Sequence, residues 1–207
     1  MKLTVNAQSS IRIQSDKVIY FDPFKIGESV HDADMIFITH DHYDHFSIED
    51  IEKVEKEDTV YIIPECMYNL LGGENVYIVS PNEKYVIEGL DVYVLASYNV
   101  NKKFHPKQKG YVGYLVKIED KRIYVAGDCD INEDNRKICC DIAFVPVGGT
   151  YTMDYKEAAE LINLIRPELA IPTHYGSIVG NRDDGLRFKE KVDEGIRVEI
   201  LLSSKTN

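Results

Sequence analysis

Three of the six histidines in this chain lie within six residues, in the segment THDHYDH that runs from Thr39 to His45. The apolar stretch Asp34–Thr39 (DMIFIT) leads directly into it and is predicted to be a strand. Open α/β sheets place their ligand-binding groups in loops at the carboxyl ends of strands. The chain is therefore expected to fold so that one strand presents this histidine loop at the edge of a sheet.

The spacing inside the loop predicts two neighbouring clusters of ligands. His40 and His42 are two residues apart in an extended chain, so their side chains point the same way. Asp44 and His45 turn towards a helix that begins after Ser47, and they can face an adjacent position. Imidazole nitrogens combined with a carboxylate are the ligands expected for zinc or a related divalent ion at a catalytic centre. One loop can thus serve two adjacent metal ions.

Two later strands end in the same manner. The predicted strand Arg122–Ala126 is followed by Gly127 and Asp128, and the predicted strand Leu169–Pro172 is followed by Thr173 and His174. Taken alone, Asp128 would be interpreted as a turn carboxylate and His174 as a histidine of the core. Together with the histidine loop, they predict that Asp128 and His174 complete the metal centre.

The rest of the pattern predicts many strands and few helices. A short helix to about Val54 is capped by Ser47, and a longer one begins at the D-x-x-E capping box of Asp154 and Glu157 and ends before Pro167. No Pro, Gly or Ser-rich linker divides the chain, so residues 1–207 are expected to form one layered α/β domain with mixed sheets. The predicted strands are Lys17–Phe21, Asp34–Thr39, Val60–Ile63, Val76–Ser80, Lys84–Ile87, Asp91–Leu95, Tyr111–Ile118, Arg122–Ala126, Asp141–Val147, Leu169–Pro172 and Val198–Leu202.

Composition excludes several classes of partner. A net charge of −11 disfavours nucleic acid, and no apolar run approaches the roughly 20 residues that a bilayer requires. The N-terminus, MKLTVNAQSSIRIQ, reads as alternating strand rather than as a secretory signal, so a cytoplasmic location is expected. The cysteines form no C-x-x-C spacing and are interpreted as small core residues; they are Cys66, Cys129, Cys139 and Cys140.

The motifs together resemble those of the metallo-β-lactamase superfamily. The resemblance rests on His-x-His-x-Asp-His at 40–45, on Gly127-Asp128 and on Pro172-Thr173-His174-Tyr175-Gly176. Tyr20-Phe21-Asp22-Pro23 and residues 146–153 (PVGGTYTM) extend it over nearly the whole chain. The latter segments are most similar to the L-ascorbate-6-phosphate lactonase-like and uncharacterised metal-dependent hydrolase branch. The resemblance implies a four-layer αββα sandwich with a dinuclear site at one edge.

The resemblance also implies the ligands and the ions. It implies two divalent ions, with Zn²⁺ as the first choice and Mn²⁺ or Fe²⁺ accepted by the same donors. Asp44 is the group expected to orient or deprotonate the attacking water. In oxygen-reducing relatives, which bind iron, a glutamate usually stands where His42 is, so hydrolysis is favoured here. The implied ligands are His40 and His42 for the first ion, Asp44, His45 and His174 for the second, and Asp128 as the bridge.

The sequence departs from the family at one ligand. The remaining first-ion histidine normally follows the strand Asp91–Leu95, where this chain reads Ala96-Ser97-Tyr98-Asn99. A loop insertion that brings His105 into this position is the favoured interpretation. The alternative is that His105 contacts substrate and that Tyr98 or Asn99 fills the gap.

Further residues are expected around the ligands. Asp22 and Thr39 are candidates to hydrogen-bond the ligands from behind, although Asp22 reads equally well as a turn carboxylate before Pro23. Tyr151 and Tyr175 are candidate donors to the substrate. A lysine group flanks His105 and would either bind a phosphate or carboxylate or form a solvated loop; it comprises Lys102, Lys103, Lys107 and Lys109.

Three functions remain open on the sequence. The first is hydrolysis of a small ester, lactone or phosphoester by a metal-activated water, with a phosphorylated sugar lactone suggested by analogy. The second is phosphodiester or nucleic-acid cleavage. The third is metal binding without catalysis. The substrate is expected to be a small molecule, and the sequence gives no indication of the oligomeric state.

Overall fold

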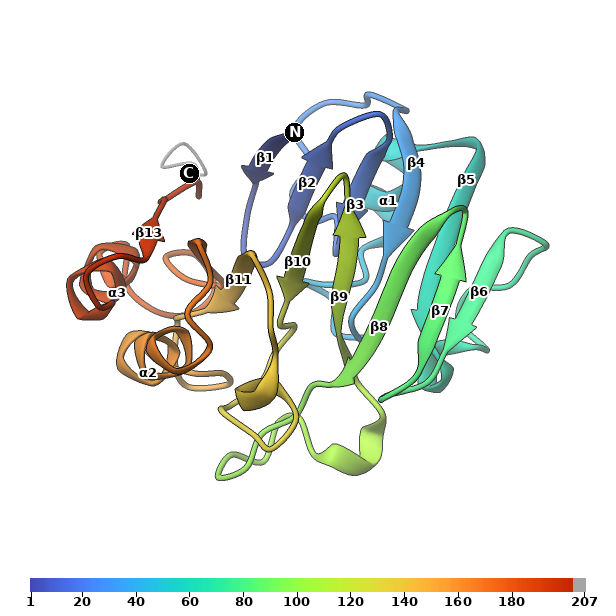
Figure 1. Cartoon of the computed structure of the whole chain (residues 1–207). Coiled ribbons are helices and arrows are strands. Elements are labelled where there is room, and N and C mark those ends of the chain that lie inside the picture. Colours follow the sequence, from blue (N-terminus) through green and yellow to red (C-terminus); the bar gives the residue numbers. More distant parts are fainter. Residues whose placement is uncertain (203–207) are drawn as a thin grey trace.

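The computed structural model describes residues 1–202 as two β-sheets that face each other (Figure 1). The first sheet has six strands in chain order: β1 (Lys2–Val5), β2 (Ile11–Gln14), β3 (Val18–Phe21), β4 (Ala33–Phe37), β5 (Glu55–Pro64) and β6 (Val76–Val79). The second sheet has the strand order β13-β12-β11-β10-β9-β8-β7. Its strands are β7 (Lys84–Ile87), β8 (Leu90–Ala96), β9 (Val112–Ile118), β10 (Lys121–Val125), β11 (Ile142–Pro146), β12 (Leu169–Thr173) and β13 (Arg197–Val198). Both sheets mix parallel and antiparallel pairs.

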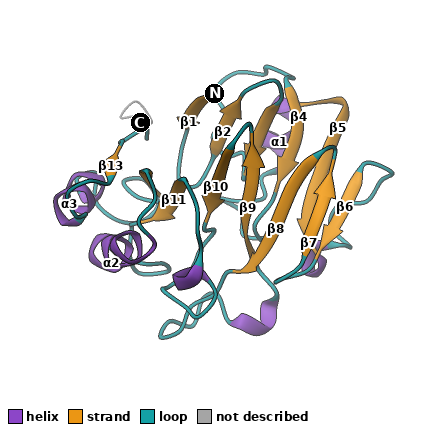
Figure 2. Cartoon of the chain, viewed as in Figure 1, coloured by secondary structure: helices purple, strands orange, loops and turns teal. Residues whose placement is uncertain are grey.

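Helices cover the outer faces of the two sheets (Figure 2). α1 (Ile48–Val54) packs on the first sheet through Ile51 and Val54. α2 (Tyr155–Ile165) and α3 (Asp184–Lys191) lie side by side on the second sheet. The large apolar core lies between the sheets. This order of layers confirms the αββα sandwich.

An aromatic contact in this core fixes the end of β4. Phe21 stacks on Phe37 with ring centroids 4.8 Å apart, and Phe37 meets Tyr114 of the opposite sheet edge-on at 5.1 Å. The Tyr114 hydroxyl donates a 2.6 Å hydrogen bond to the Ile38 carbonyl, just beyond β4. The strand that leads into the histidine loop is therefore held by side chains from both sheets.

The helix boundaries follow the predicted caps. The Ser47 side chain accepts a hydrogen bond from the Asp50 amide at the start of α1. Asp154 and Glu157 form the reciprocal capping box of α2, which satisfies two otherwise unpaired backbone amides. Short 3-10 turns span Glu65–Met67, Lys107–Lys109 and Asn135–Lys137. None of the helices in residues 1–202 is long and apolar enough to cross a membrane.

Three elements differ from the sequence prediction. The alternating N-terminal stretch is a hairpin of two strands, because the chain turns at residues 6–10, where Ser10 donates to the Ala7 carbonyl. The last strand ends at Val198 rather than Leu202, because Leu202 pairs with Val5 of the other sheet. The helix α3 was not predicted, since Phe188 is its only large buried apolar residue.

Candidate metal centre

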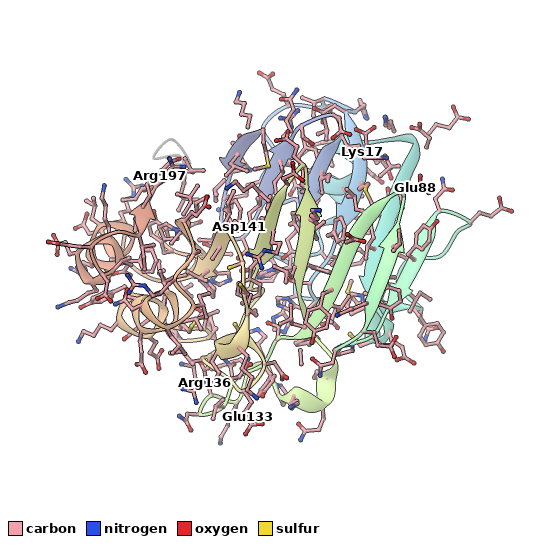
Figure 3. The ribbon with its side chains drawn as sticks, in the orientation of Figure 1. Lys17, Glu88, Glu133, Arg136, Asp141 and Arg197 are labelled. Atoms are coloured by element: carbon pink, nitrogen blue, oxygen red, sulfur yellow. The ribbon has the colours of Figure 1, made fainter. Side chains whose placement is uncertain are left out.

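The loops that follow β4, β8, β10 and β12 meet at one edge of the sandwich. In Figure 1 the loops after β8 and β10 lie together at the lower edge. The Asp130 amide donates to the Tyr98 carbonyl and joins these two loops directly. The labelled side chains of Glu133 and Arg136, at the bottom of Figure 3, mark the outer rim of this edge. Both are exposed, whereas four histidines behind them are buried: His40, His45, His105 and His174.

A three-imidazole group, consisting of His40, His42 and His105, forms one half of the centre. The Nδ1 atom of His42 lies 3.1 Å from Nε2 of His40 and 3.2 Å from Nε2 of His105. Imidazoles held tetrahedrally at about 2.0–2.1 Å from zinc have nitrogens about 3.3–3.4 Å apart. The three nitrogens therefore have the separation that a shared divalent ion requires. The structure brings His105 to His40 and His42, whereas Asn99 contacts the far nitrogen of the His105 ring and the Tyr98 hydroxyl contacts Lys107.

A carboxylate-containing group, consisting of Asp44, His45 and His174, forms the other half. Nε2 of His174 lies 3.3 Å from Oδ2 of Asp44, and Nε2 of His45 lies 3.8 Å from the same oxygen. His40 and His42 thus lie in one group and Asp44 and His45 in the other, as the spacing predicts. The division is not complete, because His40 also lies close enough to His45 and Asp128 to share an ion with them.

Asp128 stands between the two groups. Its Oδ1 atom lies 3.3 Å from Nε2 of His45, and its Oδ2 atom lies 3.2 Å from Nε2 of His174 and 3.5 Å from Nε2 of His105. Gly127 makes this turn possible, since its φ is +65° and a Cβ would lie 2.8 Å from the Val112 carbonyl oxygen. A single carboxylate therefore contacts ligand candidates on both sides.

Buried hydrogen bonds orient the rings from the first sheet. The Asp22 carboxylate accepts from the Thr39 amide at 2.8 Å, from the Thr39 hydroxyl at 2.7 Å and from Nδ1 of His45 at 2.7 Å. Because the Thr39 hydroxyl hydrogen goes to Asp22, its oxygen accepts from Nδ1 of His40 at 2.9 Å. Both rings thereby turn their Nε2 atoms towards the centre. Of the two alternatives for Asp22, the structure shows the carboxylate behind the rings.

Asn99 holds the third imidazole. Its Oδ1 atom accepts from the His105 amide at 3.1 Å and from Nδ1 of His105 at 2.9 Å. The Tyr151 carbonyl oxygen lies 3.1 Å from the same Nδ1. The Asp130 carboxylate in turn accepts from the Val100 amide at 2.9 Å and binds Lys102. The loop between β8 and His105 is thus fastened to the loop that carries Asp128.

The two groups differ in charge. Burial lowers the pKa of His105, and burial together with the nearby His45 lowers the pKa of His40 well below its ordinary value. Burial alone would lower the pKa of the other two rings, but Asp128 and then Asp22 raise the pKa of His45 well above its ordinary value. Asp128 and Asp44 likewise raise the pKa of His174 to about 9. The pKa of Asp128 lies well below its usual range because His174 and His45 outweigh its burial.

Two buried polar atoms at the junction of the groups indicate that something else binds there. Nε2 of His45 and Oδ1 of Asp128 make no hydrogen bond within residues 1–202, although each is inaccessible to solvent. Leaving such atoms unpaired costs about 1–3 kcal/mol each. Both are strong metal donors, so a cation bound between them would satisfy the two atoms at once. The donors present therefore fit a divalent metal.

The centre forms the floor of a cavity of about 420 Å³. Such a volume suits a small ligand rather than a polymer. The cavity is lined by Asp41, His42, Tyr43, Asp44, Phe104, His105, Asp128, Tyr151, His174 and Ile178.

Three of the residues predicted to contact substrate or ligands are directed elsewhere. Lys107 lies over the Tyr98 ring at 4.6 Å and pairs with Asp134 at 3.6 Å, and neither Lys107 nor Tyr98 lines the cavity. The Tyr175 hydroxyl packs against Gly185 of α3, where a Cβ would lie 2.3 Å from it. Tyr151 does line the cavity.

Sequence reasoning missed Gln8. This residue sits in the β1–β2 turn, is fully buried, and places its Nε2 atom 3.5 Å from Nε2 of His174. Its carbonyl oxygen also accepts a hydrogen bond from the His174 amide. The signal was the polar run Gln8-Ser9-Ser10 between two alternating stretches, since a buried turn needs such groups to have partners.

Comparison with known proteins gives consistent matches over the chain. The family described as the beta-lactamase superfamily domain matches residues 2–174. A UPF0173 metal-dependent hydrolase from Staphylococcus carnosus is 30% identical, over 97% of this chain and 96% of its own. A UPF0173 metal-dependent hydrolase from Methanopyrus kandleri is 29% identical, over 98% of this chain and 96% of its own.

Two solved structures share the fold. A protein from Parabacteroides distasonis, provisionally described as a metal-dependent hydrolase, superposes with a TM-score of 0.83 at 27% identity, over 97% of this chain and 93% of its own. Igni18, described as a novel metallo hydrolase from the archaeon Ignicoccus hospitalis, superposes with a TM-score of 0.78 at 23% identity, over 97% and 94%.

Proposed function

The chain belongs to the beta-lactamase superfamily and, within it, to the UPF0173 metal-dependent hydrolases, and we propose that it hydrolyses a small ester, lactone or phosphoester. The superfamily and the uncharacterised hydrolase branch are those that the motifs predict. One observation supports the reaction. Two groups of ligand-type atoms converge on Asp128 at the floor of a cavity of small-molecule size. In this proposal, residues 1–207 act as one hydrolase domain.

The proposal assigns an ion to each group. The three-imidazole group holds one divalent ion, the carboxylate-containing group holds the other, and Asp128 lies between them. Zinc is the first choice for this donor set, and Mn²⁺ or Fe²⁺ would bind to the same atoms. Two divalent ions bound there would supply acidified water as the nucleophile and positive charge for the developing oxyanion.

The protein's own groups position the reaction. Asp44 lines the cavity, and despite its burial, the hydrogen bond to His174 and the charge of His45 lower its pKa. It is therefore a carboxylate near neutral pH that can accept a hydrogen bond from the attacking water. Asp22 and Asn99 accept hydrogen bonds from Nδ1 of His45 and of His105, which turns the Nε2 atoms of both rings towards the centre.

The other two functions receive less support from the cavity. Asp41, Asp44 and Asp128 line it, and no lysine or arginine is among its ten lining residues, so a polyanionic nucleic acid would meet repulsion away from the ions. A metal-binding protein without catalysis would not require a solvent-accessible cavity next to Asp44.

The test measures metal content and hydrolysis on the same samples. Purified chain is loaded with zinc, its metal is counted by elemental analysis, and it is assayed against an ester, a lactone and bis-p-nitrophenyl phosphate. The variants are His105→Ala and, as a matched control, His31→Ala. His31 is exposed and contacts the Glu55 carbonyl oxygen outside the centre.

The expected result is about two ions per wild-type chain with hydrolysis of the ester or lactone. His105→Ala should lose one ion and most of the activity, and His31→Ala should retain both. A wild-type chain without stoichiometric metal after loading, or a fully loaded chain without turnover on the panel, would contradict the proposal.

A further inference from the structure

The walls of the cavity above the metal centre are mostly apolar. Four of its lining residues are Tyr43, Phe104, Tyr151 and Ile178. Phe104 meets Tyr151 edge-on with ring centroids 4.5 Å apart. Tyr43 meets Phe24 edge-on at 6.1 Å. Each of these two aromatic walls is therefore supported by a neighbouring ring.

Three of these side chains remain largely exposed at the opening in spite of those contacts. Tyr43 is 65% exposed, Phe104 is 50% exposed and Ile178 is 38% exposed. Apolar groups gathered around a concave site, unlike single exposed ones, typically mark a binding surface. The three residues come from three separate loops, so their meeting at one opening is a property of the fold and not of one apolar segment.

The same walls carry no lysine or arginine that could pair with an anionic substituent. The lining contains three carboxylates and no lysine or arginine. Three nearby lysines have other partners: Lys102 binds Asp130 and Glu157, Lys107 lies between Tyr98 and Asp134, and Lys25 donates to Ser177 at 3.0 Å. Two more lysines of the same loop, Lys103 and Lys109, do not line the cavity. A phosphate or carboxylate away from the reacting bond would therefore be desolvated next to aromatic rings without a counter-charge.

We propose, on the premise of the hydrolase function above, that the substrate is an uncharged ester or lactone whose non-reacting part is an apolar chain or ring. The reacting carbonyl would lie on the floor near Asp44 and Asp128, and the apolar part would lie between Phe104, Tyr43 and Ile178. Water adds to the acyl carbon and the acyl C–O bond breaks, which yields a carboxylate, a hydroxyl group and one proton. This assignment excludes the phosphorylated sugar lactone that the sequence suggests by analogy.

The first experiment varies only the apolar part of the substrate. Zinc-loaded protein is assayed with p-nitrophenyl acetate, butyrate and hexanoate, with γ-butyrolactone and γ-nonalactone, and with a phosphorylated sugar lactone. We expect kcat/KM to rise by about two- to fourfold for each added methylene, since a fully buried methylene corresponds to about fourfold. Equal rates along the series, or a preference for the phosphorylated lactone, would overturn the inference.

The second experiment measures binding without metal and so does not depend on turnover. The neutral fluorescent probe N-phenyl-1-naphthylamine is titrated into EDTA-treated protein. Phe104→Ala and Tyr43→Ala should weaken its binding by about fivefold to tenfold, which corresponds to the loss of an aromatic contact. The matched control is Leu164→Ala, an equally exposed apolar residue on α2 that does not line the cavity. It should leave probe binding unchanged.

The two experiments separate the possible failures. Probe binding that depends on Phe104, with no hydrolysis of any substrate, supports the apolar site and contradicts the hydrolase proposal. Hydrolysis that ignores chain length, with probe binding unaffected by Phe104→Ala, contradicts the apolar site alone. Phe104 is half exposed, so its truncation should leave folding intact, and a far-UV circular dichroism spectrum verifies this.

Discussion

The three-imidazole group and the carboxylate-containing group both take residues from the loop after β4, yet their buried histidines differ in protonation. In the first, burial lowers the pKa of His40 and His105, so these rings are neutral and already in the form that binds a metal. In the second, carboxylates raise the pKa of His45 and His174, and the rings are held as imidazolium partners of Asp128 and its neighbours.

The two groups also differ in whether a metal ion must displace protons when it binds. In the three-imidazole group an ion would fill a gap between ring nitrogens that are 3.1 and 3.2 Å apart, and His40 and His105 are already neutral. In the carboxylate-containing group an ion must replace protons that currently neutralise Asp44 and Asp128. We therefore expect the first group to bind metal with little dependence on pH, and the second to release protons as it binds.

The largest effect is expected from the residue that the groups share. Asp128→Asn removes the carboxylate between the groups and leaves His45 and His174 without their main counter-charge. We expect loss of both ions, a fall in kcat/KM of at least about 10³-fold, and destabilisation by about 3–5 kcal/mol. Elemental analysis, ester hydrolysis and urea unfolding measure the three quantities.

Asp50→Asn is the matched control for this variant. Asp50 is also buried, but its carboxylate accepts from the Lys25 and Ile26 amides and lies outside the centre. Its substitution should lower stability while metal content stays at the wild-type value. Retention of one full ion by Asp128→Asn would show that the two groups bind independently, and the description of Asp128 as their shared ligand would have to be abandoned.

The next largest effect is expected from variants that each remove the ion of one group only. His105→Ala should empty the three-imidazole group only, and His174→Ala should empty the carboxylate-containing group only, each with a loss of one ion and about 10²–10³-fold in kcat/KM. Isothermal titration with zinc at pH 6 and pH 8 measures the ion that remains. The site left in His105→Ala should weaken more at pH 6 than the site left in His174→Ala. Equal pH dependence would contradict the distinction drawn from charge.

A smaller effect is expected from the residue that holds His105 in place. Asn99→Ala removes the nearer of the two acceptors for Nδ1 of His105, leaving the Tyr151 carbonyl oxygen, without touching the centre itself. Such substitutions typically weaken metal binding by about 10–100-fold. Competition with a chromophoric chelator should show this loss for one ion only, and Asn99→Asp, which keeps an acceptor oxygen, should restore most of it. The control is Asn163→Ala, whose side chain binds the Lys191 carbonyl on the helical face. Weakening of both ions would show that Asn99 supports the whole fold of the edge.

The same comparison explains how much of the centre could be read from the sequence. The division of His40 and His42 from Asp44 and His45 follows from local backbone geometry, because the side chains of an extended segment alternate. Asp128 and His174 were identified because each follows an apolar strand that ends at the same edge. The fold class was predictable for the same reason, since strand patterns and capping residues are local signals.

What escaped prediction depends on contacts between distant segments. The path that brings His105 to His42 is set by Asn99 and by the Asp130 amide and carboxylate, which lie on different loops. Gln8 meets His174 across 166 positions of sequence, at the seam between the two sheets. The sequence left His105 with two alternatives because the loop length alone does not specify these hydrogen bonds.

The smallest expected effect tests the charge difference in the absence of metal. A histidine whose folded pKa is about 9, as for His174, stabilises the protein fully below the unfolded value of about 6.5, and this contribution is lost as the pH rises through 9. A histidine whose folded pKa is lowered, as for His40 and His105, makes stability fall as the pH drops below about 6.5. The contribution of these three histidines to the free energy of unfolding of the metal-free protein should therefore be largest near pH 6.5.

Two variants show which histidine causes the loss of stability above, and which below, the pH of maximum stability. Urea unfolding of EDTA-treated protein between pH 5 and pH 9 should show a decline on the alkaline side of up to about 1.4 kcal/mol per pH unit for each proton retained. His174→Ala should flatten the alkaline side, where His45 alone remains with a raised pKa, and His105→Ala should flatten the acidic side. If both variants change the same side, the two groups do not differ in protonation. The ordering of their metal affinities with pH would then need a cause other than buried charge.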